Sequence, residues 1–292
     1  MFKKSLIAVM VLSMMLALTG CSSKKADSGK LDVMVSINPL KEFTEAIGGD
    51  KVNVESLVPE GMEPHDFEPK TKDFQKLSDS KIFIYNGLGL EDWAGDVLDT
   101  IDKSKVKVVV ATDGINVLNT DNIEDPHAWL SLLESKKMCE NIKNSLVEAD
   151  SANKDYYESR YKTYADSMQK LYDENARKFS TLKNRDFVTS HEAFGYLCRD
   201  FNLQQKSVAN LFGEGEITPK KLEELVKYIR VNKINTIFSE NSASQKTSET
   251  LAKDTGAKIQ KIYTLETKED NLDYLAAMKE SLNRIYQSLN SI

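Results

Sequence analysis

The sequence predicts an α/β protein of two lobes, each a mostly parallel four-stranded sheet flanked by helices, joined by one long rigid helix. Short apolar runs alternate with amphipathic stretches along residues 31–147 and again along residues 183–292, which is the rhythm of strand–helix units. Residues 148–182 lack proline and glycine and carry one apolar stripe on a charged background. A length of 292 residues with 40% hydrophobic content suffices for two compact domains.

The first lobe, residues 31–147, is expected to contain four strands and four helices. The predicted strands are the apolar runs at residues 31–37, 52–57, 81–87 and 106–111. The predicted helices are the amphipathic stretches at residues 39–49, 72–80, 90–101 and 129–149. Gly48 and Gly49 end the first of these helices, because glycine adopts the conformation that closes a helix without strain.

The linking segment, residues 148–182, is typical of one continuous helix. Its apolar residues recur every three or four positions, at Tyr157, Tyr161, Tyr164, Met168 and Leu171. A helix of about thirty residues spans ~45 Å, which is more than one lobe needs. The stripe covers too few heptads for a coiled coil. We therefore expect this helix to connect the two lobes.

The second lobe, residues 183–292, repeats the alternation. Its predicted strands are residues 186–190, 205–210, 234–238 and 258–264, and its predicted helices begin with residues 192–201, 218–232 and 244–256. Thr218 is the expected N-cap of the second helix, with Pro219 in its first turn. A final helix carries a core-facing stripe made of Leu272, Leu275, Met278, Leu282, Ile285 and Leu289.

The N-terminus is typical of a targeting segment. Two lysines precede an apolar stretch too short to span a bilayer, so residues 1–20 are predicted to be a signal peptide. The segment ends in "LTGC", which resembles the lipobox of bacterial lipoproteins, and Cys21 is therefore the expected site of lipidation. Residues 21–30 form a polar tether. The protein is then anchored by lipid on the extracytoplasmic face of the cell membrane.

The charge pattern argues against a nucleic-acid partner. The net charge is −6, and lysines and arginines are spread along the chain without a basic block. Nucleic acid selects a clustered basic surface. We expect a monomer with no nucleic-acid partner.

Two cysteines besides Cys21 lie in helical patterns. Cys139 and Cys198 could form a disulfide in an extracytoplasmic compartment, but their spacing in the sequence does not establish the required geometry. The favoured interpretation is two buried thiols that act as small apolar side chains.

The three histidines of the chain occupy similar local contexts. His65 lies in "EPHDF", His127 in "DPHAW" and His191 in "SHEAF", each with an aromatic residue shortly after it. Spacings of 62 and 64 residues exclude a zinc finger, whose ligands lie a few residues apart. All three follow strands, and open parallel sheets bind ligands beyond the carboxyl ends of their strands. The sequence therefore predicts one metal site between the lobes.

Acids and aromatic residues accompany these histidines. The acids that could orient the imidazoles are Glu63, Asp66, Asp125 and Glu192. For any single acid, however, a solvated loop charge is the favoured interpretation. Phe67, Trp93 and Trp129 suit the lining of a dry site and a hydrophobic core equally well.

At this point a family resemblance becomes specific. The stretch "PHDFEPKTKDFQKLSDSKIFIYNGLGLEDW" resembles the N-lobe signature of the metal-binding lipoproteins of zinc and manganese ABC transporters, the cluster A-I substrate-binding proteins. "DPHAWL" and "SHEAFGYL" are similar to the second and third ligand motifs of that family. The resemblance covers nearly the whole mature chain. It implies a receptor that captures a divalent metal and delivers it to a membrane permease driven by an ATPase subunit.

The resemblance also implies the ligand positions, with two departures. His65, His127 and His191 fall on family ligands. The family's fourth ligand is often an aspartate, but the resemblance places Leu265 at that position, with Glu266 next to it. Water or Glu266 is expected to complete the site ahead of Glu240. The histidine-rich loop of some zinc members is absent, since residues 113–125, which precede the His127 motif, contain no histidine.

The donor set favours Zn²⁺ over Mn²⁺. Three imidazoles and one oxygen suit tetrahedral zinc, whereas manganese sites prefer carboxylates, and manganese members of the family typically carry an acid in place of His191. The alternative is the same transport role with Mn²⁺ as the physiological metal.

Two rival functions use the same residues. A zinc-dependent hydrolase has three histidines and an open position, with Glu192 as a general base. In a surface adhesin, the metal would serve only to stabilise the fold. Ligands divided between two lobes suit capture and release, so we expect a binding protein and not an enzyme.

Overall fold

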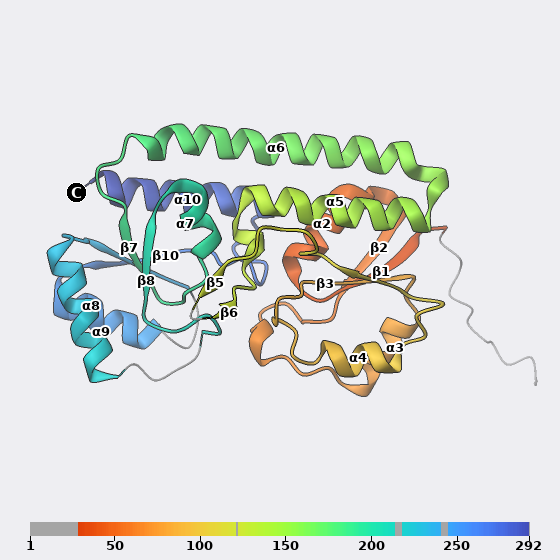
Figure 1. The fold of residues 1–292 in the computed structure, drawn as a ribbon, viewed down its shortest axis with the longest axis horizontal. Helices are drawn as coiled ribbons and strands as arrows, with labels where there is room; N and C mark the ends of the chain where they lie inside the picture. Colours follow the sequence, from red (N-terminus) through yellow and green to blue (C-terminus); the bar gives the residue numbers. More distant parts are fainter. Residues whose placement is uncertain (1–28, 121, 214–217, 241–244, 292) are drawn as a thin grey trace, which may run out of the picture. The chain divides into compact units, whose positions relative to one another are not determined.

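Two parallel four-stranded sheets organise the computed structural model of this chain (Figure 1). The structure describes residues 29–120, 122–213, 218–240 and 245–291, and Leu31–Ile292 forms one compact unit. The strand orders are β2-β1-β3-β4 and β10-β9-β7-β8, and every neighbouring pair in them is parallel. The predicted fold class is therefore confirmed. The predicted signal peptide and Cys21 lie outside the described residues.

The N-terminal lobe follows the predicted alternation of strands and helices. Its elements are β1 (Leu31–Val35), α2 (Asn38–Gly48), β2 (Val52–Ser56), α3 (Thr71–Ser78), β3 (Ile82–Tyr85), α4 (Ala94–Thr100), β4 (Lys107–Val110) and α5 (Leu132–Ala149). Helices α2 and α5 cover one face of the sheet, and α3 and α4 lie on the other (Figure 1). Because both faces are covered, β1 and β3 are apolar runs whose residues Val35, Phe83 and Ile84 are fully buried.

The C-terminal lobe has the same organisation. Its elements are β7 (Asp186–Thr189), α7 (Gly195–Phe201), β8 (Gln204–Ser207), α8 (Pro219–Val231), β9 (Thr236–Ser239), α9 (Gln245–Thr255), β10 (Lys258–Lys261) and α10 (Tyr274–Asn290). Thr218 caps α8 as predicted, since its side chain accepts a hydrogen bond from the Lys221 amide at 3.2 Å. The last helix begins later than its apolar stripe suggests, because Asp273 caps it, and Leu272 therefore lies outside α10.

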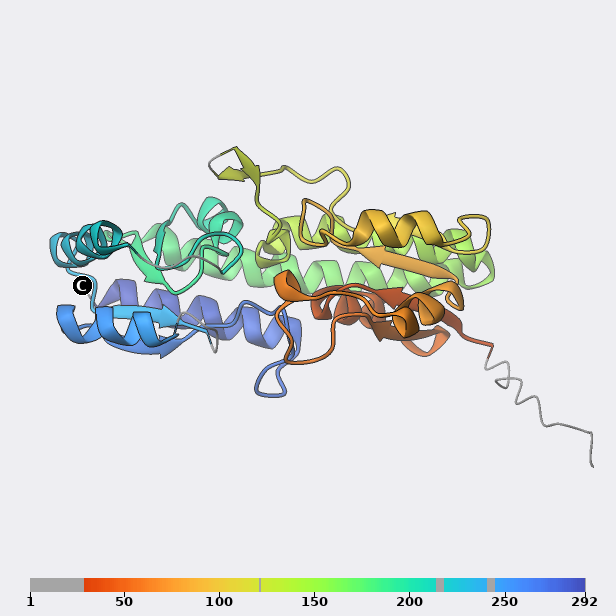
Figure 2. The ribbon, with the colours of Figure 1, turned by 90° about the horizontal axis from the view of Figure 1, so that it is seen from below.

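The long helix α6 (Lys154–Ser180) is unbroken over 27 residues, as its sequence predicts. It packs along α5 and also contacts α2 and α10, so it lies over both lobes (Figures 1 and 2). Tyr157 and Met168 from its stripe are fully buried. One hydrophobic core joins residues of the first sheet, such as Val35, with Met168 of α6 and Leu282 of α10. The two lobes therefore share a core beneath α6.

Three local features depart from the pattern. The segment before His127 forms an antiparallel pair, β5 (Asn119–Thr120) and β6 (Ile123–Glu124), which stands out from the body in Figure 2. Helix α4 begins four residues later than predicted, and α7 begins three residues later. The late start of α4 follows from Glu91, whose buried carboxylate accepts the amides of Asn86 and Gly87 at 2.8 and 2.9 Å and holds this segment in turns.

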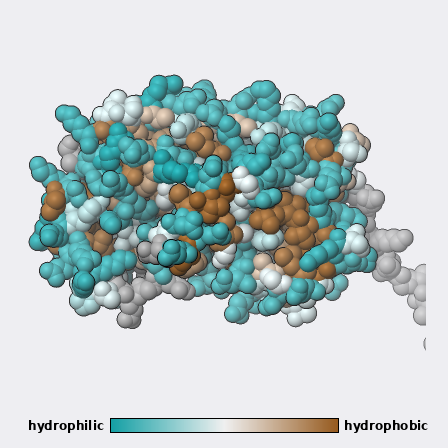
Figure 3. Space-filling view, in the orientation of Figure 1, coloured by the Kyte–Doolittle hydropathy of each residue, from teal (hydrophilic) through white to brown (hydrophobic). Residues whose placement is uncertain are grey.

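Cys139 and Cys198 are both buried and unpaired, which agrees with the favoured interpretation of two apolar thiols. Among the described residues, no helix is long and apolar enough to cross a membrane. The face drawn in Figure 3 is mostly hydrophilic and is interrupted by a few apolar patches.

Candidate metal centre

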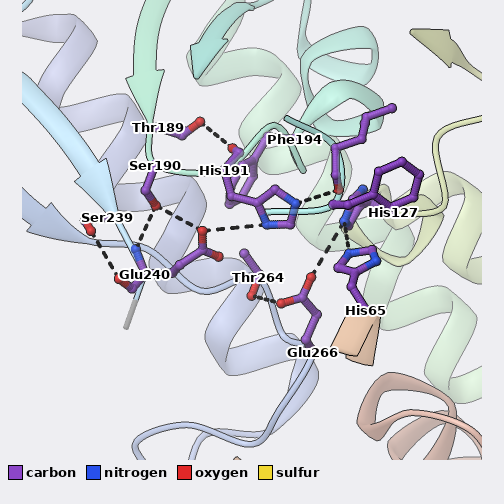
Figure 4. Close-up of polar contacts among 12 residues, drawn as sticks. His65, His127, Thr189, Ser190, His191, Phe194, Ser239, Glu240, Thr264 and Glu266 are labelled. Atoms are coloured by element: carbon purple, nitrogen blue, oxygen red, sulfur yellow. Dashed lines mark hydrogen bonds and ion pairs between the residues drawn. The ribbon is translucent and has the colours of Figure 1, made fainter. Parts of the chain in front are cut away.

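The three histidines and one glutamate converge between the sheets (Figure 4). One ligand atom from each of His65, His127, His191 and Glu266 lies within 4.8 Å of the other three. The imidazole ring centroids are 4.9–5.8 Å apart. The four residues predicted from the sequence are thus brought together, whereas Glu240 lies at the edge of this group.

Each of these side chains lies beyond the carboxyl end of a strand. His65 lies in a 3₁₀ turn, Pro64–Asp66, in the loop after β2, and His127 precedes the 3₁₀ turn Ala128–Leu130. His191 follows β7 by two residues, and Glu266 lies in the loop after β10. The N-terminal lobe therefore supplies two imidazoles, and the C-terminal lobe supplies one imidazole and one carboxylate.

Asp125 holds the ring of His127. Its Oδ1 atom lies 2.8 Å from Nδ1 of His127 and accepts the backbone amide of the same residue at 2.9 Å. Both side chains are buried, and this contact directs Nε2 of His127 towards the centre of the group. The interpretation of Asp125 as a solvated loop charge is therefore wrong. Asp66, in contrast, is exposed.

His65 and His127 are poised as neutral ligands. Burial lowers the pKa of His65 to about 2, and the neighbouring imidazoles add to this effect. Burial likewise holds the pKa of His127 well below its usual value. Their Nε2 atoms lie 3.4 Å apart, and Nε2 of His127 lies 3.6 Å from Oε1 of Glu266. A tetrahedron with arms of about 2.0–2.1 Å has edges of about 3.3–3.4 Å, close to these separations.

His191 has a different environment. Its Nδ1 atom lies 3.6 Å from Oε1 of Glu240, and its Nε2 atom donates to the carbonyl of Leu211 at 2.7 Å. Burial lowers the pKa of His191, but the adjacent carboxylate of Glu240 outweighs burial and raises the pKa to about 10. Ser190 donates to the same Glu240 oxygen at 3.0 Å. Glu240 thus contacts a candidate ligand and is not one of the four clustered residues.

Glu266 offers an oxygen without a partner. Its Oε2 accepts the hydroxyl of Thr264 at 2.9 Å, whereas its buried Oε1 has no hydrogen-bond partner among the described residues. Burial raises the pKa of Glu266 to about 8, and the charge of Glu63 acts in the same direction. A buried carboxylate oxygen with no donor is suited to a cation. The preceding residue, Leu265, has φ +67° and is buried, so the turn directs Glu266 and not Leu265 into the group.

Aromatic rings wall the group on two sides. Phe212 packs edge-on against His65 with centroids 5.5 Å apart, and Trp129 lies 5.2 Å from the ring of His127. The Trp129 indole also donates to the carbonyl of Thr264 at 2.7 Å, which ties the two lobes together. Phe67 and Trp93 instead pack on each other in the core. No local pattern indicates Phe212 as part of the site, because its partner His65 lies 147 positions earlier.

Comparison with known proteins agrees with this geometry. Residues 33–288 match the family described as zinc-uptake complex component A, periplasmic. A protein of Treponema pallidum (strain Nichols) described as metal-binding is 39% identical, over 91% of this chain and 89% of that one. The high-affinity zinc uptake system protein ZnuA of Bacillus subtilis (strain 168) is 34% identical, over 99% of both chains. A manganese ABC transporter substrate-binding lipoprotein of Streptococcus gordonii, scaA, is 32% identical, over 98% of this chain and 99% of that one.

Solved structures show the same fold. The Zn(II)-bound ZnuA-like domain of Streptococcus pneumoniae AdcA is 34% identical, with a TM-score of 0.79, and the match covers 90% of this chain and 100% of that one. A mutant of the laminin-binding adhesin Lmb of Streptococcus agalactiae is 29% identical, with a TM-score of 0.83 over 89% and 99%. This chain therefore belongs to the zinc-uptake complex component A family, whose members include substrate-binding lipoproteins of metal ABC transporters.

Proposed function

We propose that His65, His127, His191 and Glu266 bind a divalent metal ion as cargo, which the protein delivers to an ABC permease for import. The observation that carries this proposal is the convergence of four ligand atoms, from both lobes, within 4.8 Å. The unpartnered Oε1 of Glu266 and the oriented Nε2 of His127 support it, because both face the centre of the group.

The proposed cargo is Zn²⁺. Three nitrogens and one oxygen match its preferred tetrahedral donor set, and the shorter separations in the group fit the edges of such a tetrahedron. Mn²⁺ prefers oxygen donors and more ligands. The relatives include proteins named for zinc and one named for manganese, so the donor set and not the family supports this choice.

The proposed setting is the outer face of the cell membrane. Cys21 carries the lipid, residues 21–30 form the tether, and the protein acts as a monomer on a permease with its ATPase subunit. The names of relatives as substrate-binding lipoproteins of ABC transporters support this setting. The role is binding without catalytic turnover, in keeping with that family.

Metal capture is expected to proceed without wide closure of the lobes. We propose lobes at residues 31–147 and 183–292, and the site lies where they meet. They share one core beneath α6, and Trp129 bonds across them to Thr264. Metal binding then rearranges side chains and loops, as would be seen in metal-free and zinc-loaded crystals that differ by no large domain rotation.

The test is elemental analysis of protein purified without added metal, paired with competition titrations of Zn²⁺ and Mn²⁺. We expect one tightly bound zinc per chain and a large preference for zinc. Glu266→Gln should weaken zinc binding, while the matched control Glu192→Gln, an acid next to His191 but outside the four-atom group, should not. Equal losses in both variants, or no bound metal, would overturn the proposal. Zinc-dependent hydrolysis of ester or peptide substrates would point instead to an enzyme.

A further inference from the structure

A groove lined by lysines lies at the opposite end of the first sheet from the metal site. It has a volume of 410 Å³ and is bordered by the residues that precede β3 and β4 and by the end of α5. Its charged lining residues are Lys81, Lys103, Lys105, Lys107 and Glu148. The metal site lies beyond the carboxyl ends of the strands, so the proposed cargo function makes no use of this groove.

The groove is positively charged although the chain as a whole has a net charge of −6. Lys105 pairs with Asp102 at 2.8 Å, and Lys107 pairs with Glu148 at 2.5 Å. Lys81 and Lys103 are exposed and make no ion pair with any described residue. Lys81 and Lys103 therefore carry uncompensated charge, whereas Lys105 and Lys107 are paired with nearby acids.

The groove lies beside the beginning of β1, at the start of the described unit. The amide of Lys81 donates to the carbonyl of Asp32 at 2.8 Å, and the amide of Lys107 donates to the carbonyl of Lys81 at 2.9 Å. The groove thus adjoins the beginning of β1, where the tether joins the fold. Residues 21–30 span at most about 35 Å when fully extended. A lipid on Cys21 therefore keeps the groove within reach of the membrane surface.

We propose that this groove binds the phosphate groups of anionic phospholipids in the membrane that holds the anchor. The proposal rests on the lipid anchor of the proposed function and is independent of the metal ligands. Lysine ammonium groups act as point charges towards phosphate, and a membrane surface presents many phosphates to an open, exposed groove. An acidic protein is otherwise repelled by such a surface, so this contact determines which end faces the bilayer.

The contact also has a consequence for metal capture. Because the groove and the metal site lie at opposite ends of β3 and β4, a protein resting on the groove turns its metal site away from the bilayer. The ligands then face the medium from which zinc is taken. Delivery to the permease requires the protein to leave this pose.

The experiment uses the full-length lipidated protein in vesicles and an amine-reactive label read out by mass spectrometry. Neutral phosphatidylcholine vesicles are compared with vesicles that contain phosphatidylglycerol. We expect Lys81, Lys103 and Lys105 to react about fivefold more slowly on anionic vesicles, because a lysine near such a surface gains about 1 kcal/mol of electrostatic interaction, which corresponds to about fivefold. Lys220 and Lys227, exposed on α8, serve as reference lysines and should react equally on both.

A matched pair of variants separates a local groove from general charge. Lys81→Glu with Lys103→Glu should abolish the protection of Lys105 on anionic vesicles. Lys220→Glu with Lys227→Glu changes the net charge equally and should leave that protection intact. Equal protection at groove and reference lysines, or equal loss in both double variants, would overturn the proposal. Unchanged zinc affinity in both double variants shows that each fold is intact.

Two further measurements distinguish lipid phosphate from free phosphate, and a failure of the anchor from a failure of the groove. If inorganic phosphate at about 10 mM, where salt screening is weak, protects the same lysines on neutral vesicles, the groove binds free phosphate and the lipid proposal fails. If the protein does not remain on neutral vesicles, the proposed anchor fails. In that case, co-sedimentation with anionic vesicles alone still decides whether the groove binds lipid phosphate.

Discussion

The two halves of the candidate metal site differ in their readiness for a cation. In the N-terminal half, burial keeps His65 and His127 neutral, and Asp125 holds the ring of His127 in place. In the C-terminal half, both nitrogens of His191 have partners, and its pKa is raised to about 10, while that of Glu266 is raised to about 8. The first half is ready to bind a metal ion, whereas the second must first release protons.

The largest expected effect on zinc affinity comes from a substitution in the N-terminal half of the site. His127→Ala removes the imidazole whose Nε2 atom lies 3.4 Å from that of His65 and 3.6 Å from Oε1 of Glu266. Zinc affinity should fall by more than about a hundredfold, since loss of an outer partner alone costs about 10–100-fold. Competition titration with a chelator of known affinity measures the loss. Retention of wild-type affinity would show that the N-terminal half is not the primary binding element.

The next effect tests the orientation of His127. Asp125→Asn keeps the size of the side chain but weakens its hold on Nδ1 of His127, so zinc affinity should fall about 10–100-fold. Asp66→Asn is the matched control, because Asp66 is exposed in the loop that carries His65. Equal affinities for the two variants, measured by the same titration, would remove the distinction between an orienting acid and a solvated one.

A third prediction tests the protons held by the other half. Because the raised pKa values of His191 and Glu266 keep a proton on each of them in the metal-free protein, zinc affinity should rise about a hundredfold per pH unit between about pH 6 and pH 7, and less steeply as the pH passes the Glu266 value of about 8. The free-histidine value near 6.5 alone would instead predict a plateau above about pH 7. Calorimetry in buffers of different ionisation enthalpy counts the protons released per zinc ion.

Glu240→Gln is the matching variant for this count. It removes the adjacent negative charge that raises the pKa of His191, so burial should then keep this imidazole neutral. We expect about one proton fewer to be released per zinc ion than in the wild type. An unchanged count would mean that the proton does not come from His191.

The smallest effect concerns the bond that joins the two halves. Trp129→Phe removes the donor to the carbonyl of Thr264 and leaves that buried carbonyl without its partner, so the free energy of unfolding should fall by about 1–3 kcal/mol. In the control, Trp93→Phe, the indole N–H is buried without a partner among the described residues, and its loss should cost less. Denaturant unfolding measures both. The reverse order would show that the lobes do not depend on this contact.

The sequence predicted those features that depend on local patterns. Apolar runs predicted the eight strands of the two large sheets, and an unbroken stripe predicted α6. Thr218 with Pro219 marked the start of α8 because capping involves only neighbouring residues. The three histidines were found by their shared context, and the strand ends explained how residues 62 and 64 positions apart could meet.

The features that were missed depend on contacts between distant residues or on single side chains. The buried carboxylate of Glu91 delays α4, and no periodicity reveals that contact. Asp125 could not be distinguished from a solvated acid, because only burial separates the two. The positive φ of Leu265 directs Glu266 into the site, and no sequence pattern reveals this shift by one residue.

The shared core beneath α6 limits the motions by which the protein can release its proposed metal ion. A receptor with separate cores can open like a clamshell, and its dissociation rate then follows the rate of domain motion. Here Val35, Met168 and Leu282 belong to one core, so separating the lobes would expose apolar surface to water. We therefore expect exchange of the proposed ion to depend on the loops that carry His65 and Glu266. A permease that deforms one of these loops would speed release without having to unpack the interior.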